Sequence, residues 1–117
     1  FARRDTSEKY AEDIDLNFVE YVKNLLETIQ SDMYNRALNR RNELTFTATN
    51  LKEVENIMNK QPGFVKADWC GCEECELKMK EIKGTKSRCI VDENMVTGKC
   101  VVCGKEAKHT VIWGIQY

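Results

Sequence analysis

Cysteine spacing constrains this chain more than any other feature of its sequence. All six cysteines lie in the last third, three in the run W-C-G-C-E-E-C of residues 69–75 and two in the run C-V-V-C of residues 100–103. The two runs stand about 25 residues apart, with Cys89 alone between them. Two short thiol segments of this kind are typical of a single tetrahedral zinc site that both segments close.

Two other uses of six thiols fit the pattern less well. Three disulfides would suit a small, loop-rich secreted protein, but the first 69 residues contain no cysteine and their sequence pattern is mostly helical. A redox-active Cys-x-x-Cys pair normally stands alone in a thioredoxin-like unit, whereas two clusters occur here. The spacing therefore favours metal binding, and a redox module stays open as an alternative.

The run C-V-V-C-G of residues 100–104 predicts one half of the site, a tight turn whose backbone N–H groups point at the sulfurs. The other half is ambiguous, because three thiols compete for two places: Cys70, Cys72 and Cys75. Cys75 belongs to either possible pair, and its expected position at the start of a helix would favour its thiolate.

Four thiolates would fill the coordination sphere of zinc, which predicts a structural site with no open position for water. His109 is the single histidine, and we expect it to be a strand or surface residue and not a ligand. Cys89 is expected to lie buried and inert in the middle of a strand. The sequence shows no Ser-His-Asp set, P-loop or G-x-G-x-x-G motif, so no catalytic centre is predicted within it.

Composition narrows the class of protein. Of the 117 residues, 32% are charged and the formal net charge is −1, which argues for a soluble protein and against one that coats nucleic acid. No run of about 18 apolar residues is present, so no membrane span is expected. The chain begins at Phe1 without an initiating Met, and we therefore expect a fragment or a processed product.

A long helix is predicted to begin at Asn17, where Glu20 completes a capping box and Leu16 can pack as a staple against Tyr21. Its apolar stripe follows helical spacing: Phe18, Val22, Leu25, Ile29 and Met33. Threonines at positions 45, 47 and 49 break the pattern. A second, short helix is predicted from a capping box at Asn50, and the Q-P-G run of residues 61–63 ends it.

The remaining pattern predicts a helix over residues 73–83 and four strands: 64–67, 87–91, 99–102 and 110–115, the last of them central. The predicted fold class is α+β (an α/β two-layer arrangement), a small mixed sheet packed with helices, closed by a four-cysteine zinc site and preceded by a long linker helix. We expect three parts: residues 1–16 as the tail of a preceding domain, 17–62 as a helical linker region, and 63–117 as the zinc-binding module.

Several short motifs resemble the C-terminal zinc domain of prolyl-tRNA synthetases of the type found in archaea, eukaryotes and some bacteria. The matching runs are G-F-V-K-A (63–67), W-C-G (69–71), C-E (75–76), R-C-I (88–90), G-K-C (98–100), C-G-K (103–105) and the closing tyrosine. The run R-R-D-T of residues 3–6 resembles the end of the anticodon-binding domain of the same family. The resemblance thus covers nearly the whole chain.

The resemblance implies an appendage of a class II ligase that attaches proline to tRNA(Pro) through a prolyl-adenylate made from ATP with magnesium. Such enzymes work as cytoplasmic homodimers, and their catalytic and anticodon-binding domains precede the present segment, which would not be catalytic by itself. The implied ligands of a structural zinc ion are Cys70, Cys75, Cys100 and Cys103. Cys72 departs from the family pattern and is a rival ligand. Tyr117 is implied to turn its terminal carboxylate towards the catalytic domain.

A free-standing zinc-ribbon adaptor that binds RNA or protein is the alternative function. Its support is the basic second half of the long helix, which carries Arg36, Arg40 and Arg41 and could contact RNA phosphate or a neighbouring domain. A solvated helix face explains the same residues more simply.

Overall fold

The computed structural model describes residues 1–61, 63–91 and 94–116. The chain forms two compact units, residues 1–40 and 41–117. The helix α1 (Phe18–Glu43) provides most of the first unit and continues into the start of the second. None of the described helices is long and apolar enough to cross a membrane.

The N-terminal segment of the first unit packs on α1. A bridge joins Ala2 to Lys9, and Ser7 turns the chain with a φ of 64°. The ring of Phe1 lies 5.8 Å from the rings of both Phe18 and Tyr21, measured between centroids. These contacts cover part of the apolar stripe of α1, which would otherwise face water.

An ion-pair network centred on Asp5 fixes the same segment. Arg3 donates to both carboxylate oxygens of Asp5 at 3.1 and 2.7 Å, and also to Asp32 of α1 at 2.7 Å. Arg36 donates to the Asp5 carbonyl oxygen at 2.8 Å. The hydrogen bonds from Arg3 hold the pKa of Asp5 below its usual range, against the opposing effect of its burial. Arg36, predicted as part of a basic helix end, is therefore paired within its own unit.

The start of α1 agrees with the predicted cap position but not with the predicted staple. The helix begins at Phe18, directly after Asn17, whose N–H donates to the Asp15 carboxylate. The predicted staple of Leu16 against Tyr21 is wrong, because Leu16 is fully exposed. The helix length of 26 residues agrees with the pattern, and the first four stripe positions are half-buried: Phe18, Val22, Leu25 and Ile29.

The second unit contains two shorter helices, α2 (Leu51–Lys60) and α3 (Glu73–Glu81). The predicted cap of α2 is confirmed, since the side chain of Asn50 accepts from the N–H of Glu53 at 3.0 Å. Glu53 itself reaches back to the N–H and hydroxyl of Thr49, one residue before the cap. These bonds satisfy backbone donors at the start of the helix that would otherwise have no partner.

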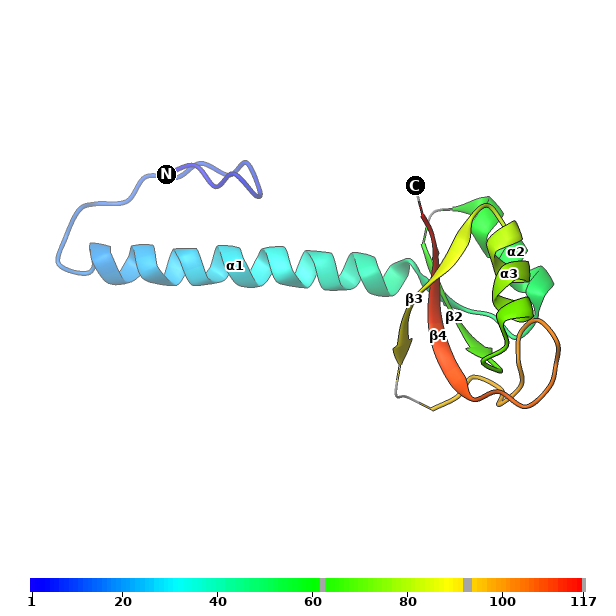
Figure 1. Cartoon of the computed structure of the whole chain (residues 1–117). Coiled ribbons are helices and arrows are strands. Elements are labelled where there is room, and N and C mark those ends of the chain that lie inside the picture. Colours follow the sequence, from blue (N-terminus) through cyan, green and yellow to red (C-terminus); the bar gives the residue numbers. More distant parts are fainter. Residues whose placement is uncertain (62, 92–93, 117) are drawn as a thin grey trace. The chain divides into compact units, whose positions relative to one another are not determined.

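A four-stranded mixed sheet forms the other layer of this unit (Figure 1). Its strands are β1 (Thr45–Thr47), β2 (Phe64–Trp69), β3 (Thr85–Val91) and β4 (His109–Ile115), in the order β1-β2-β4-β3. Strand β1 pairs parallel to β2, and β4 pairs antiparallel to both β2 and β3. The predicted α+β class with a mixed sheet is confirmed, as is the central position of β4.

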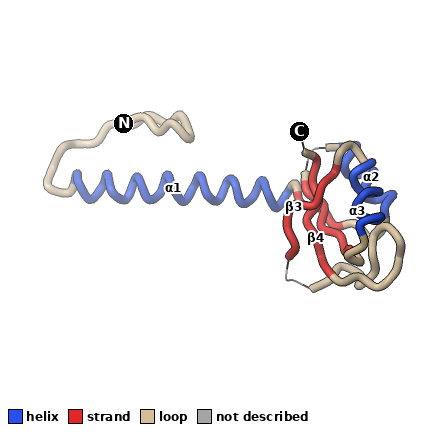
Figure 2. Tube along the Cα trace, in the orientation of Figure 1, coloured by secondary structure: helices blue, strands red, loops and turns tan. Residues whose placement is uncertain are grey.

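Both short helices cover one face of the sheet (Figure 2). The sheet side of the core is set by period-2 alternation, with Val65 opposite Trp113 and Ala67 opposite Val111. The helices contribute Val54, Met58 and Met79, all at most 2% exposed. Four core residues belong to the two central strands: Val65 and Ala67 of β2, and Val111 and Trp113 of β4. Their packing fixes the position of the residues that follow β2.

Two predicted elements differ from the structure. Residues 99–102 were expected to form a strand, but only an isolated bridge from Lys99 to Glu106 is present and the chain turns directly after it. Thr45 and Thr47, which were expected only to end the long helix, instead lie in β1, whose parallel partner β2 lies about 20 residues further along the chain. Short edge strands of this kind depend on their partner, so local pattern does not reveal them.

Replacing Asp5 with Asn is expected to release the N-terminal segment from α1, because the amide offers one acceptor where Arg3 and Arg36 use both carboxylate oxygens. Hydrogen exchange of residues 1–10 should quicken, while exchange in residues 63–116 stays unchanged. Since the pKa of Asp5 is lowered by folding from an ordinary 3.8, its contribution is complete above that value and lost as pH falls through the lower folded value. Asp13→Asn, at an exposed position, is the control. Unchanged exchange in the Asp5 variant would contradict this assignment.

Candidate metal centre

Four thiols converge at one end of the sheet of the second unit. Their sulfur atoms all lie within 4.8 Å of one another, and they belong to Cys70, Cys75, Cys100 and Cys103. We call this group the thiol cluster. All six cysteines of the chain are free, so the sulfurs of the thiol cluster are close without being bonded as disulfides.

The spacing of the thiol cluster fits a tetrahedral ion. Zinc–sulfur bonds of about 2.3 Å place neighbouring sulfurs of a regular tetrahedron about 3.8 Å apart. The Sγ atoms of Cys70 and Cys75 lie 3.7 Å apart, and those of Cys103 and Cys70 lie 3.8 Å apart. Four sulfur donors at this separation suit zinc and leave no coordination position for water.

Three separate pieces of the chain supply these sulfurs. Cys70 directly follows the last residue of β2, and Cys75 lies in the first turn of α3. Cys100 and Cys103 flank a tight turn, in which the N–H of Gly104 donates to the Cys100 carbonyl at 2.9 Å. Gly71 and Gly104 have φ values of +86° and +71°, which a glycine adopts without strain at these two sharp turns.

Cys72, the rival ligand, lies apart from the thiol cluster in the described part of the chain. It is exposed and occupies the position just before α3. Its carbonyl oxygen accepts a hydrogen bond of 3.1 Å from the indole N–H of Trp69, which ties the turn to the sheet. The backbone at position 72 therefore has a structural role, while the side chain points outward to solvent.

Acidities within the thiol cluster are uneven. Burial tends to raise the pKa of Cys100, but backbone N–H groups of Cys103, Val102 and Cys70 donate to its sulfur and lower the pKa to about 7. Burial raises the pKa of Cys75, and the neighbouring thiols add to this shift. The expectation that the helix start would favour the Cys75 thiolate is therefore not met, because burial and the neighbouring thiols outweigh it.

His109 and Cys89 were both predicted not to be metal ligands, and the predicted burial of one of them is wrong. His109 begins β4 and contacts the ring of Trp69, with centroids 6.1 Å apart, as expected for a strand residue. Cys89 was expected to be buried, and this is wrong: its side chain is exposed on the edge strand β3. Every residue from Lys86 to Ile90 is exposed, so this edge strand is open to solvent on both faces over that stretch.

Sequence reasoning missed Asp68, which lies in β2 and is 1% exposed. Its carboxylate accepts three hydrogen bonds from the backbone N–H groups of Val96, Thr97 and Gly98, and a fourth from the hydroxyl of Thr110. Burial alone would raise the pKa of Asp68, but these donors together hold it below its usual range. An acid between Ala67 and Trp69, two residues before a candidate ligand, was the available signal.

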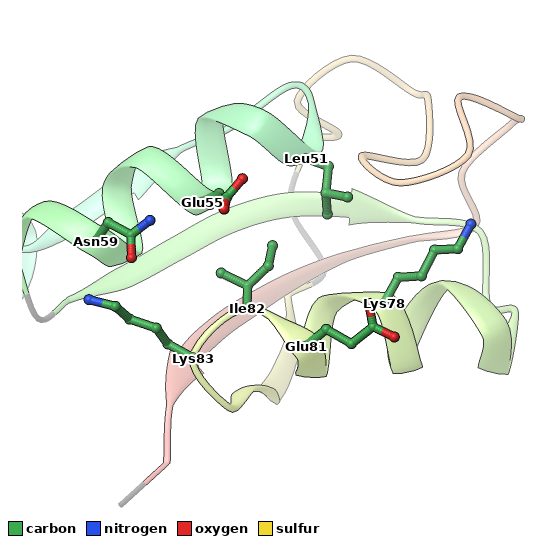
Figure 3. A pocket seen from close by; sticks show the side chains of 7 residues that line it. All are labelled: Leu51, Glu55, Asn59, Lys78, Glu81, Ile82 and Lys83. Carbon is green, nitrogen blue, oxygen red and sulfur yellow. The ribbon is translucent and has the colours of Figure 1, made fainter.

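A groove of about 580 Å³ between α2 and α3 offers no comparable chemistry (Figure 3). Glu55 and Asn59 reach into it from α2, and Lys78 and Glu81 from α3. Its remaining lining is Leu51, Ile82 and Lys83. Mixed charges around two apolar side chains form neither a set of metal ligands nor a nucleophile with a base, so the thiol cluster is the candidate functional site.

Comparison with known proteins places this geometry in a family. The model of the family described as prolyl-tRNA synthetase, C-terminal, matches residues 51–117. Proline–tRNA ligase of Clostridium novyi is 44% identical over 116 residues, and proline–tRNA ligase 2 of Bacillus cereus is 42% identical over the same length. Each match covers 98% of this chain and 24% of the relative.

A solved structure agrees. Prolyl-tRNA synthetase from Cryptosporidium parvum, complexed with L-proline and AMP, superposes with a TM-score of 0.85 at 28% identity, covering 99% of this chain and 25% of that one. The present chain thus spans about a quarter of the length of the proteins it matches. With a family model that covers more than half of its residues, the chain belongs to the prolyl-tRNA synthetase C-terminal family.

Proposed function

We propose that the thiol cluster holds one structural zinc ion. The observation that carries this proposal is the separation of the sulfurs, 3.7 and 3.8 Å, which matches the edge of a zinc–thiolate tetrahedron. When bound, the ion supplies charge neutralisation and a cross-link between three chain segments. The four cysteines leave it no open position, so its role is to hold the fold and not to activate water.

The whole protein that contains this chain is, in our proposal, a proline–tRNA ligase. Support comes from the relatives of that name and from the C. parvum enzyme, whose structure was solved as a complex with L-proline and AMP. ATP and magnesium would bind in the catalytic domain and not in the segment described here. The catalytic residues would likewise lie outside these 117 residues.

Partners of the chain follow from the same proposal. They are the catalytic and anticodon-binding domains of the same enzyme, and tRNA(Pro) through those domains, in a cytoplasmic homodimer. The proposed contact of the Tyr117 carboxylate with the catalytic domain rests on the family resemblance, because Tyr117 lies outside the described residues. A free-standing adaptor, the alternative from the sequence, has no specific contact in its favour.

Metal removal tests the structural role. We expect one zinc per chain by elemental analysis, and we expect a strong chelator to unfold the second unit, because formation of the site is coupled to folding. Both tryptophans, Trp69 and Trp113, lie in that unit, so their fluorescence reports its packing. Zinc addition should reverse the change. A metal-free chain with unaltered fluorescence and thermal melting would refute the proposed site.

A matched pair of cysteine variants tests the ligand set. Cys70→Ser should weaken zinc binding by more than the roughly 10–100-fold that loss of an outer hydrogen-bond partner costs, since a ligand itself is lost. Cys72→Ser should bind zinc as the unmodified chain does, because its sulfur lies outside the thiol cluster. Competition with a chromophoric chelator measures both affinities. The opposite ranking of the two variants would move the ligand from position 70 to position 72.

Aminoacylation assays test the proposed parent activity. The full-length protein should charge tRNA(Pro) with proline in the presence of ATP and magnesium, and the 117-residue chain alone should not. The control is an equal concentration of a second amino acid of similar size, such as alanine. Charging with an amino acid other than proline would overturn the proposal for the parent enzyme and would leave the metal site untouched.

A further inference from the structure

We propose that Asp68 is a positioning residue of the metal centre, whose carboxylate holds the loop of residues 96–98 so that the Cys100 turn meets Cys70. This inference rests on the proposed zinc site and assigns a role to a residue that is not itself a ligand.

Four hydrogen bonds occupy the acceptor positions of the Asp68 carboxylate. An ionised carboxylate has two oxygens with about four acceptor positions. Oδ1 accepts from the N–H of Val96 at 3.1 Å and from the hydroxyl of Thr110 at 2.7 Å. Oδ2 accepts from the N–H groups of Thr97 and Gly98 at 2.8 and 2.9 Å. Among the described residues no ion pair includes Asp68, so these donors alone offset the cost of burying it.

Three of these four contacts join the sheet to the segment that carries two sulfurs of the thiol cluster, and the fourth, from Thr110, lies within the sheet. Asp68 lies two residues before Cys70, and Gly98 lies two residues before Cys100. Backbone bonds extend the same junction, because the carbonyl oxygen of Asp68 accepts from the N–H of Val101 at 2.9 Å. The carboxylate therefore holds the segment that carries Cys70 against the segment that carries Cys100, at positions two residues before each cysteine.

Asp68 accepts three hydrogen bonds from the loop, and the N–H of Ala107 adds another by donating to the Gly98 carbonyl at 2.9 Å. In the described residues between the end of β3 and Lys99 there is no strand or helix, and the segment that approaches the site is therefore irregular. Three consecutive N–H groups pointing at one carboxylate replace the missing sheet pairing. A site whose ligands come from separate segments needs such support, since a ligand displaced by about 1 Å no longer fits the metal geometry.

The test compares Asp68→Asn with Thr110→Val in the 117-residue chain. In either orientation of the Asn amide, at least one loop N–H faces an NH₂ group and loses its acceptor. Thr110→Val removes one hydrogen bond to the same carboxylate but leaves all three loop bonds in place. Both variants remove a buried polar contact, and they differ in whether the loop is released.

Three measurements separate a positioning role from a general loss of stability. The first is zinc release to a chromophoric chelator, which we expect to be about 10–100-fold greater at equilibrium for Asp68→Asn and near the unmodified value for Thr110→Val. The second is the visible spectrum of the cobalt(II)-loaded protein, which should change only in Asp68→Asn because it reports ligand geometry. The third is the urea unfolding midpoint of the zinc-loaded chain, which records how much stability each variant loses.

Equal zinc affinity and equal cobalt spectra for Asp68→Asn and the unmodified chain would overturn the inference. So would losses of zinc affinity in both variants that simply follow their losses of stability. If Asp68→Asn does not accumulate as folded protein, zinc-loaded Asp68→Ser takes its place with the same expectations. Failure of the unmodified chain to bind zinc would instead refute the proposed site itself, and the inference would fall with it.

Discussion

Repulsion among four closely spaced sulfurs is the constraint on which the second unit depends. Two thiolates about 3.8 Å apart repel each other by roughly 1 kcal/mol in water and roughly 4 kcal/mol at an effective dielectric constant of about 20. The thiol cluster contains several such pairs, so it cannot carry four charges without a cation. Its acidities agree, because the pKa is lowered for Cys100 and raised for Cys70 and Cys75. A divalent ion would remove this repulsion and join the three segments at once.

Much of this architecture follows from local sequence pattern. Capping and periodicity predicted α2 and α3 closely, because the signals that define a short amphipathic helix lie within it. The apolar run V-I-W-G-I predicted a central strand, and β4 occupies that place. Motif resemblance singled out the same four cysteines that the structure brings together, whereas spacing alone left both Cys70 and Cys72 open.

What could not be predicted depends on contacts between distant residues. Local sequence does not distinguish Asp68 from the other acidic residues, because its hydrogen-bond donors lie in the distant loop of residues 96–98. Cys89 has the neighbours of a buried strand residue, yet it is exposed because it lies on the edge strand β3, where residues 86–90 are all exposed. The pairing of Arg36 with Asp5 likewise joins residues about 30 positions apart, beyond the range of local pattern.

The position of the thiol cluster along β4 limits what an ion bound there could do directly. At one end of the strand, His109 pairs with Trp69, which precedes the first cysteine of the thiol cluster. At the other end, Ile115 pairs with Thr85 at the start of β3. Seven residues at about 3.3 Å each separate these ends by roughly 20 Å, well beyond direct contact with an ion. Any influence of a bound ion on the C-terminal residues would therefore pass through the pairing of β4 with β2 and β3. The paired strand, and not proximity to the ion, is the physical link between the thiol cluster and the end of β4.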